Sequence, residues 1–364
     1  MMGGFPRRPP ALLFGVPIDD LTIDEAVTVV GDLIAAGRLH GRTHQVATVN
    51  VDFLVNALHD ASVRQVLQNA DLCLADGAPV VWGARAAHMA LSERIAGADL
   101  VPLLAARSVA TGWRIHLFGS APGTAERAAD VLIERFPGAH VTGDSGPFIS
   151  DVSQLDEGLL ASLCAADPDI LCVALGNPKQ EKFIQTYRQR IGAPVLIGIG
   201  GTLDFIVGGR RRAPLWVQGV GLEWVVRAAQ EPVRLGKRYA KDALVFFPRL
   251  TRYLRIVRRR RQADSLRYDI AGSELFVTVD RNAGEPGAQW QQAIDVAANA
   301  GNVKIDIGQT SGLSMRSVCE LVELIRAARR AGAPAEVRPV SDLLTEQMRA
   351  MSLTTYVVMS ETNQ

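Results

Sequence analysis

The first two thirds of this chain alternate short apolar runs with segments of helical periodicity, and this alternation limits the folds open to it. The apolar runs are at 45–49, 70–74, 114–118, 140–143, 169–174 and 194–199. Buried strands that alternate with helices indicate a parallel sheet covered by helices on both faces. We therefore predict an α/β fold, with a short edge strand at 14–16 and a capped helix that begins at Thr22.

Polar or glycine-rich stretches directly follow several of these runs, at 48–50, 76–77, 119–123 and 176–180. In parallel α/β sheets ligands bind beyond the carboxyl ends of the strands, so we expect these stretches to meet at one site. The stretch 175–181, Leu-Gly-Asn-Pro-Lys-Gln-Glu, joins a strand to a helix, where backbone N–H groups favour phosphate. An ordinary helix start with polar surface residues explains this stretch equally well.

The standard nucleotide-binding motifs are absent. The stretch Gly-Ile-Gly at 198–200 begins like a dinucleotide fingerprint, but Leu203 occupies the position of its third glycine, and no P-loop pattern occurs. A nicotinamide oxidoreductase is therefore the remotest of the functions considered. A nucleotide can still bind, but not through either motif.

Asp76 is the carboxylate that most suggests chemistry, because it ends a strand and precedes a glycine and a helix. It can act as a helix N-cap, or as a general base at a strand end, where partial burial raises a carboxyl pKa. Arg94 follows 18 residues later, where it can face the same pocket or lie on the surface. The sequence leaves both pairs of alternatives open.

The composition bears on whether the protein binds a metal, is secreted or spans a membrane. The chain has 364 residues, 48% of them hydrophobic, and a net charge of +1. Four separate cysteines and six histidines show no metal-ligand spacing, so no metal or cofactor is predicted. We recognise no secretory signal and no apolar window of about 18 residues, so we expect a cytoplasmic protein.

A strongly basic stretch runs from 227 to 261, with twelve Lys and Arg residues against Glu231 and Asp242. Leu250, Tyr253, Leu254 and Val257 follow helical spacing within it, and Pro248 is expected to lie near the helix start. An anionic membrane surface, a nucleic-acid patch and a solvated linker helix are the three interpretations. The aliphatic bulk favours the membrane surface, and we expect no nucleic-acid partner.

Six blocks of sequence, in the same order, resemble the WecG/TagA/CpsF glycosyltransferases (glycosyltransferase family 26). The blocks are Thr-Val-Asn at 48–50, Ala-Asp-Leu-Cys-Leu-Ala-Asp-Gly at 70–77, Arg-Ile-Ala-Gly-Ala-Asp-Leu at 94–100, the stretch 175–181, Gly-Gly-Thr-Leu-Asp-Phe at 200–205, and Gly-Leu-Glu-Trp at 221–224 with Gln-Glu-Pro at 230–232 and Arg234. The resemblance covers residues 14 to 250. It implies a Rossmann-like catalytic domain followed by a basic helical appendage.

The resemblance also implies an activity: an inverting, metal-independent transfer from a UDP-sugar to a sugar on a polyprenyl diphosphate. Such a protein would be peripheral on the inner face of the cell membrane and would serve bacterial surface polysaccharide synthesis. Asp76 matches the family's catalytic base. The residues that match its substrate pocket are Thr48, Asn50, Arg94 and Gln180. The candidates for binding the nucleotide diphosphate are Gly119, Ser120, Gly176, Lys179, Arg227, Arg234 and Arg238.

The chain after 261 changes in composition and resembles a STAS domain, a small α/β fold. Strands are expected at 266–270, 275–279, 303–307 and 335–338, and helices at 290–298, 314–331 and 343–351. Ser314 and Ser317 are expected to start a helix. The predicted domains are thus catalytic (1–212), basic appendage (213–261) and STAS-like (265–358), the last with a protein partner or regulatory role.

Two functions follow from this sequence. The first is the membrane-associated UDP-sugar transferase just described. The alternative is a non-catalytic regulator that binds a nucleotide and signals through the STAS-like domain. Because Asp76, Arg94 and Gln180 are all present, the sequence favours the enzyme.

Overall fold

The computed structural model of this protein describes most of the chain, with gaps. The described residues are 8–208, 217, 223, 225–226, 236–259, 265–272, 274–280, 287–299, 302–306, 313–332, 335–338 and 342–353. They fall into two compact units. The first contains Leu21–Val81 and Ser92–Ala243, and the second contains Pro6–Asp20, Trp82–Leu91 and Leu244–Gln364.

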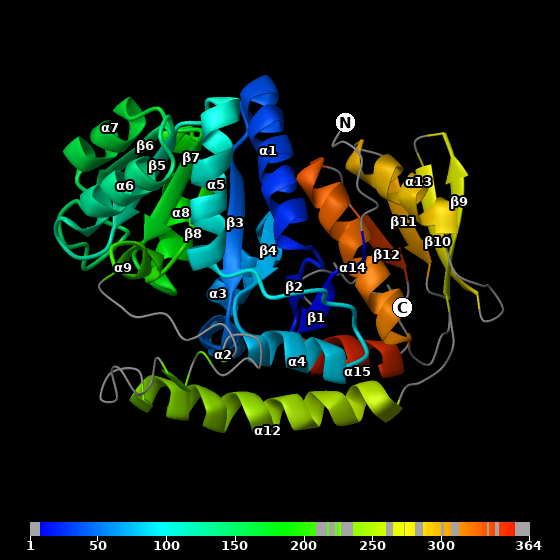
Figure 1. Ribbon diagram of the computed structural model, residues 1–364. Coiled ribbons are helices and arrows are strands. Elements are labelled where there is room, and N and C mark those ends of the chain that lie inside the picture. The colour runs from blue at the N-terminus through cyan, green and yellow to red at the C-terminus, as the bar shows by residue number, and fades with distance from the viewer. Residues whose placement is uncertain are drawn as a thin grey trace. The chain divides into compact units, whose positions relative to one another are not determined.

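A six-stranded parallel sheet forms the centre of the first unit (Figure 1). Its strands are β3 (His44–Val49), β4 (Leu72–Ala75), β5 (Ile115–Gly119), β6 (Val141–Asp144), β7 (Ile170–Ala174) and β8 (Val195–Gly198). They lie in the order β4-β3-β8-β7-β5-β6, and each neighbouring pair is parallel. This sheet confirms the α/β, Rossmann-like fold that the sequence predicted.

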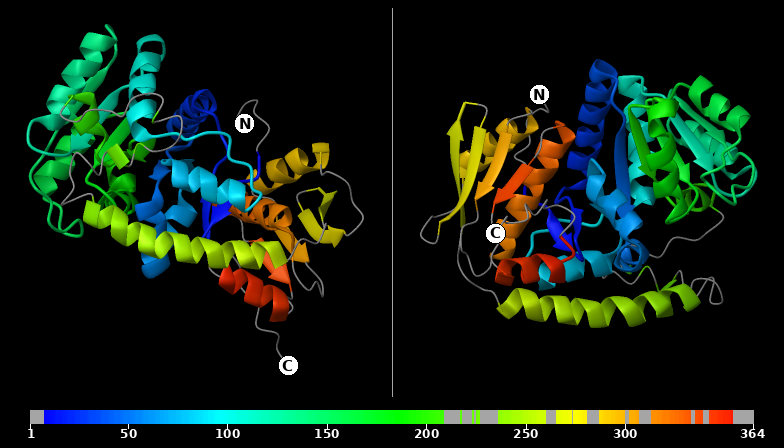
Figure 2. Two further views of the ribbon diagram at one scale, coloured as in Figure 1. Left: turned by 60° about the horizontal axis from the view of Figure 1, so that its bottom comes forward. Right: turned by 180° about the vertical axis from the view of Figure 1, so that it is seen from behind.

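Helices cover both faces of this sheet (Figure 2). One face packs against α1 (Ile23–His40), α5 (Gly97–Thr111) and α6 (Thr124–Arg135), and the other against α7 (Glu157–Ala165) and α8 (Lys179–Ile191). The helix α3 (Ala61–Asn69) packs on α8, α2 (Val51–His59) packs on α3, and α9 (Thr202–Ile206) follows β8. Because both faces are covered, nearly all strand residues are buried, which explains their continuous apolar runs.

Local sequence signals set where these helices begin. Thr22 and Glu25 form the predicted capping box of α1: Thr22 Oγ1 accepts a hydrogen bond from Glu25 N, and Glu25 Oε2 accepts one from Thr22 N. Asn50 caps α2, because its side chain accepts a hydrogen bond from Phe53 N. These bonds satisfy backbone donors that a helix start leaves free.

The second unit begins with a two-stranded hairpin, β1 (Ala11–Leu13) and β2 (Val16–Ile18). The predicted single edge strand at 14–16 is therefore wrong. Phe14 and Gly15 form the turn, with φ of 53° and 79°. Two successive residues with positive φ suit the right-handed twist of a tight hairpin, whereas an extended strand requires negative φ.

A four-stranded sheet lies in the C-terminal part of the second unit. It contains β9 (Ser265–Ala271), β10 (Glu274–Asp280), β11 (Asn302–Asp306) and β12 (Ala335–Arg338), in the order β12-β11-β10-β9. In this sheet β9 and β10 are antiparallel, whereas β10–β11 and β11–β12 are parallel. The helices are α13 (Gly287–Ala298), α14 (Met315–Arg330) and α15 (Asp342–Ala350). The predicted element order is confirmed, while the likeness to the STAS fold stays a prediction.

The helix α14 is the buried centre of this unit. Its residues 317–328 are all buried, and Ser314 caps it as predicted, accepting a hydrogen bond from Ser317 N. Arg326 is 2% exposed and forms two bonds to the Asp19 carboxylate, at 2.9 and 3.2 Å, and one to Glu323 at 2.9 Å. A segment at the start of the chain is thus part of this core.

The basic helix α12 (Lys237–Arg259) corrects two expectations. Pro248 lies inside the helix, not near its start. The proline is on the exposed side, where water can satisfy the carbonyl it frees. The apolar face expected to meet lipid is largely buried in protein: Phe246, Leu250, Tyr253 and Val257 are each at most 9% exposed.

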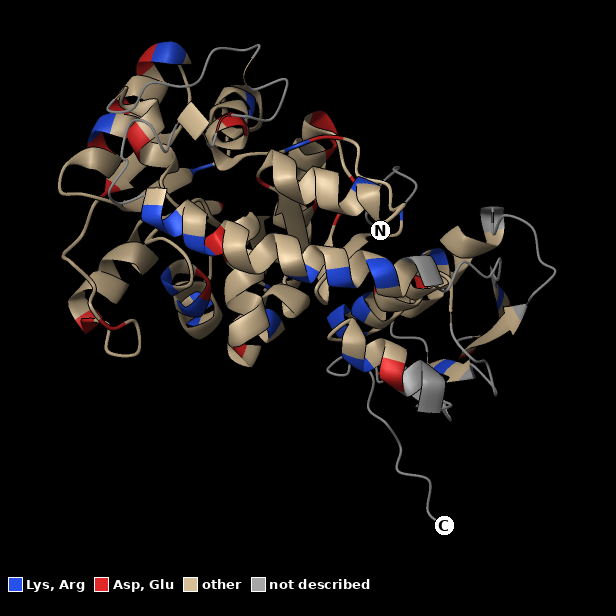
Figure 3. Ribbon diagram, turned by 90° about the horizontal axis from the view of Figure 1, so that it is seen from below, with Lys and Arg blue, Asp and Glu red and all other residues tan. Residues whose placement is uncertain are grey.

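Aromatic contacts hold the part of α12 after residue 243 within the second unit. Phe14 lies edge-on against both Phe246 and Tyr253, with ring centroids 5.7 and 5.6 Å apart. Tyr253 OH donates a hydrogen bond to the carbonyl oxygen of Leu12 at 2.6 Å. Figure 3 shows Lys and Arg residues along the length of the helix. Within the described part of the chain, every helix is too short or too polar to span a bilayer.

Candidate active site

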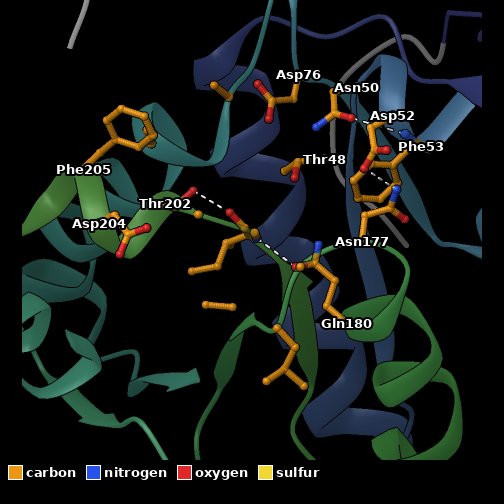
Figure 4. A pocket seen from close by; sticks show the side chains of 18 of the residues that line it. Thr48, Asn50, Asp52, Phe53, Asp76, Asn177, Gln180, Thr202, Asp204 and Phe205 are labelled. Atoms are coloured by element: carbon orange, nitrogen blue, oxygen red, sulfur yellow. Dashed lines mark hydrogen bonds between the residues drawn. The ribbon is translucent and has the colours of Figure 1, made fainter. Parts of the chain in front are cut away.

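A pocket of about 270 Å³ lies at the carboxyl edge of the large sheet (Figure 4). It is lined by residues that follow β3, β4, β5, β7 and β8, together with the first turn of α12. This is where open α/β sheets bind ligands, and its volume approaches the range of about 300–1,000 Å³ of small-molecule sites. The structure thus brings the predicted strand-end stretches together.

Thr48, Asn50 and Asp76 lie together on one side of this pocket, at the ends of β3 and β4. The register Thr48↔Leu74 and Val49↔Ala75 makes this arrangement possible, and Asp76 N donates a hydrogen bond to Val49 O at 2.8 Å. Thr48 Oγ1 donates to Gly198 O at 2.8 Å, which fixes its hydroxyl. Asp76 is partly exposed, so its carboxylate can meet a ligand.

Backbone turns form another part of the pocket. Ser120 and Gly176 line it, and Gly119 lies beside them at the end of β5. Gly119, Ser120 and Gly176 all have positive φ, of 96°, 74° and 76°. Ser120 N donates a hydrogen bond to Ala174 O at 3.0 Å. The glycine turn at Gly176 is therefore the part of this backbone that suits an anionic ligand.

Gln180 lines the pocket but is completely buried, and its amide is bonded to protein at both ends. Its Nε2 donates to Glu181 Oε1 at 2.8 Å, and its Oε1 accepts from Gly200 N at 2.9 Å. The residue predicted to bind substrate therefore also holds the turn that follows β8.

Two further predicted site residues have other partners. Lys179 Nζ donates to Ile149 O at 2.9 Å and lies over the Phe148 ring. Arg94 forms ion pairs with Glu223 and Asp99. Both lie outside the described set of pocket-lining residues.

Three arginines were predicted to bind the nucleotide diphosphate, and the structure describes one of them, Arg238. Arg227 and Arg234 lie outside the described residues. Arg238 lines the pocket beside Tyr239, in the first turn of α12. Further along this helix, burial and the nearby charge of Asp52 raise the pKa of Asp242 to about 6, against the opposing influence of Arg238 and Lys241.

Several residues that line the pocket were not predicted as site residues from the sequence, among them Asp52, Asp204 and Phe205. Asp52 accepts a hydrogen bond from Asn177 Nδ2 at 3.0 Å, and Asp204 accepts one from Ser120 Oγ at 3.4 Å. Asp204 and Phe205 belong to the family block 200–205, and that block could have identified them as site residues. No motif in the sequence pointed to Asp52, which lies two residues beyond Asn50.

The described residues that line the pocket include three carboxylates, Asp52, Asp76 and Asp204, and the cation of Arg238. Among the described residues no cluster of three or more His, Cys, Asp or Glu side chains is arranged to hold a metal ion. The arrangement can accept a proton at a carboxylate beside an amide and a hydroxyl, and can hold an anionic group near the arginine.

The parallel sheet and its polar pocket define a Rossmann-like α/β protein with a candidate active site. The chain belongs to the glycosyl transferase WecG/TagA/CpsF family, whose sequence model matches residues 11–261. This match confirms the family resemblance found in the sequence.

Two curated relatives are similar to this chain, and both are called N-acetylglucosaminyldiphosphoundecaprenol N-acetyl-beta-D-mannosaminyltransferase. The relative from Bacillus subtilis (strain 168) is 32% identical over 189 residues, which are 52% of this chain and 72% of the relative. The relative from Bacillus spizizenii is 31% identical over 189 residues, with the same coverage.

Proposed function

We propose that this protein is an inverting glycosyltransferase that uses a UDP-sugar donor and a sugar on a polyprenyl diphosphate as acceptor. The names of the two relatives support N-acetylmannosamine as the sugar transferred and N-acetylglucosaminyl-diphosphoundecaprenol as the acceptor. The observation that carries the proposal is the placement of Asp76 beside Asn50 and Thr48 in the carboxyl-edge pocket.

In the proposed reaction the acceptor hydroxyl attacks the anomeric carbon of the donor from the face opposite UDP. Asp76 takes the proton of that hydroxyl as the new glycosidic bond forms, and the bond from the anomeric carbon to the diphosphate oxygen breaks. One displacement of this kind inverts the anomeric configuration. Asp76 is partly exposed in a polar pocket, so an acceptor hydroxyl can reach its carboxylate, which becomes a neutral acid when it takes the proton.

The electron pair of the broken bond remains on UDP, which leaves with additional negative charge. Cations and backbone N–H groups directed at this charge stabilise the transition state. Arg238 is the cation that the described pocket lining offers, and the turn at Gly176 places backbone in the same lining. The family match extends the proposal to Arg227 and Arg234.

The test is release of UDP from UDP-N-acetylmannosamine with a short-chain polyprenyl diphosphate-N-acetylglucosamine acceptor. In Asp76→Asn the base is lost, and we expect kcat to fall by roughly 10²- to 10⁴-fold while UDP binding stays within about threefold. The matched control is Asp167→Asn, since Asp167 is an exposed aspartate whose positive φ of 42° asparagine tolerates.

The outcomes separate the hypotheses. UDP release that requires acceptor and Asp76 supports the transferase. Full activity of Asp76→Asn would contradict the base assignment. UDP binding without release, across a panel of UDP-sugars and acceptors, would instead support the non-catalytic regulator.

We also propose that the protein is peripheral on the inner face of the cell membrane, where a polyprenyl-linked acceptor is held. The exposed side of α12 supports this, because it combines apolar and basic side chains. Leu244 is 77% and Phe247 49% exposed. The exposed basic residues of the same helix are Lys237, Arg238, Lys241, Arg249, Arg252 and Arg255. Each basic residue near an anionic surface contributes about 1 kcal/mol.

A further inference from the structure

Glu181 is a buried carboxyl group at the start of α8 that the proposed reaction does not use. It is 1% exposed, and its Oε1 accepts the hydrogen bond from Gln180 Nε2. Its other oxygen, Oε2, has no hydrogen-bond partner among the described residues. A carboxyl group in such a place requires an explanation, because burial of an unpaired charge is costly.

The environment of Glu181 favours the neutral acid over the carboxylate. Burial is the main cause, and the charge of Asp52 acts in the same direction, so the pKa of Glu181 is raised to about 8. Among the described groups Asp52 is the charged residue that acts on it electrostatically in this direction. The Gln180 side chain opposes the shift by donating to Oε1, but does not cancel it.

The Gln180 amide can satisfy both of its neighbours in only one orientation. Gly200 N is a donor and must face the amide oxygen, whereas Glu181 Oε1 is an acceptor and must face the amide nitrogen. Removing the acceptor at Glu181 would remove one of the two bonds that fix this orientation.

The turn after β8 is built around this amide. A Cβ at Gly198 would lie 2.5 Å from Gln180 Nε2 and 2.7 Å from Glu181 Oε1, so only glycine lets the pair approach the strand. Thr48 Oγ1 holds the carbonyl of Gly198. Gly200, Gly201 and Thr202, the next residues, line the pocket.

We propose that Glu181 is a positioning residue that orients the Gln180 amide against Gly200 and so fixes the pocket wall at 198–202. It does this as a neutral acid. The inference rests on the proposed function for its effect on catalysis. Glu181 acts through Gln180 and touches no reacting atom.

The experiment compares wild type with Glu181→Gln and Glu181→Leu. Glutamine retains a carbonyl acceptor but cannot ionise, whereas leucine has a similar size and no acceptor. We expect kcat/KM of Glu181→Gln at pH 7 to stay within about threefold of wild type, and that of Glu181→Leu to fall at least about tenfold. Glu157→Gln, which removes an exposed glutamate, is the charge-matched control.

The pH profile separates positioning from a purely structural role. Wild-type activity should decline as pH rises through about 8, because a carboxylate buried at this position lacks solvation and the surrounding pocket wall must rearrange to admit water. That decline should be absent in Glu181→Gln and present in Glu157→Gln. A decline that persists in Glu181→Gln, or a tenfold loss in that variant at pH 7, overturns the proposal. If Glu181→Leu does not fold, Glu181→Gln alone decides.

Thermal unfolding provides a second test of Glu181 that does not depend on the proposed transferase activity. The raised pKa of Glu181 stabilises the folded state below its usual pKa of 4.5, and this contribution is lost as pH rises toward 8. We therefore subtract the thermal unfolding midpoint of Glu181→Gln from that of wild type at each pH. This difference should decrease as pH rises from 5 to about 8 and then stay constant. A constant difference overturns the proposal even if transfer is observed. Absence of transfer at any pH, with the expected midpoint trend, counts against the function alone.

Discussion

At the residue scale, glycines around the pocket determine which side chains can approach the sheet. A Cβ at Gly97 would lie 2.6 Å from Thr202 Oγ1, which itself donates a hydrogen bond to Ile199 O at 2.6 Å. Gly97 belongs to the recognised block 94–100, and Thr202 to the block 200–205. Close packing between two blocks that are distant in sequence gives a physical reason for a small residue at this position.

Gly97→Ala should therefore damage both stability and the pocket. The added methyl group must displace Thr202, and overpacking of this kind costs about 1–3 kcal/mol. Gly83→Ala is the control, since its added Cβ would meet neighbours at ordinary distances of 3.5–3.6 Å. Urea unfolding measures the difference, and equal midpoints for the two variants would contradict the packing argument.

At the element scale, α12 shows how one helix carries two kinds of surface. Its buried side packs aromatic and aliphatic residues within the protein, and its exposed side retains Leu244 and Phe247 among basic residues. Periodicity identified the first side correctly as apolar but assigned it to lipid. A helix face of this composition packs equally well on protein or on lipid, so only the tertiary contacts distinguish the two.

Membrane binding should therefore depend on the exposed side of α12. The double variant Leu244→Glu, Phe247→Glu removes apolar contact and adds two negative charges, so we expect at least about tenfold weaker binding to anionic vesicles. The control is Leu39→Glu, because Leu39 is as exposed as Leu244 but lies on α1. Sedimentation with phosphatidylglycerol vesicles measures the effect. Equal loss in the control would show that the effect is nonspecific.

At the scale of the whole molecule, both units are built from segments far apart in the chain. In the second unit Arg326 of α14 pairs with Asp19, 307 residues earlier. The hairpin β1–β2 and the C-terminal part of the chain therefore share a core. Removal of the chain after 261 would take away α14 and leave Asp19 without Arg326.

Arg326→Ala should be strongly destabilising. It leaves the Asp19 carboxylate without its buried cation and leaves Glu323 with Arg330, and breaking a buried ion pair in this way costs about 3–5 kcal/mol. Arg329→Ala on the exposed side of the same helix is the control, with a change within about 0.5 kcal/mol. The free energy of unfolding in urea measures both, and a loss below about 1 kcal/mol for Arg326→Ala would contradict the buried-pair argument.

The sequence by itself determined the features that depend on neighbouring residues. The capping box at Thr22, the cap at Ser314, the alternation of strands and helices and the family blocks are all local patterns, and each was confirmed. They also placed Thr48, Asn50 and Asp76 at strand ends, and the general rule for parallel sheets then predicted one shared site.

The tertiary structure alone decided which groups face each other. Phe14 and Gly15 form a turn, Pro248 continues a helix, Arg94 pairs with Glu223 and the Gln180 amide joins Glu181 to Gly200. Several of these outcomes depend on contacts between residues far apart in the chain. Burial and hydrogen-bond geometry come from such contacts, and a local sequence pattern contains no information about its distant partner.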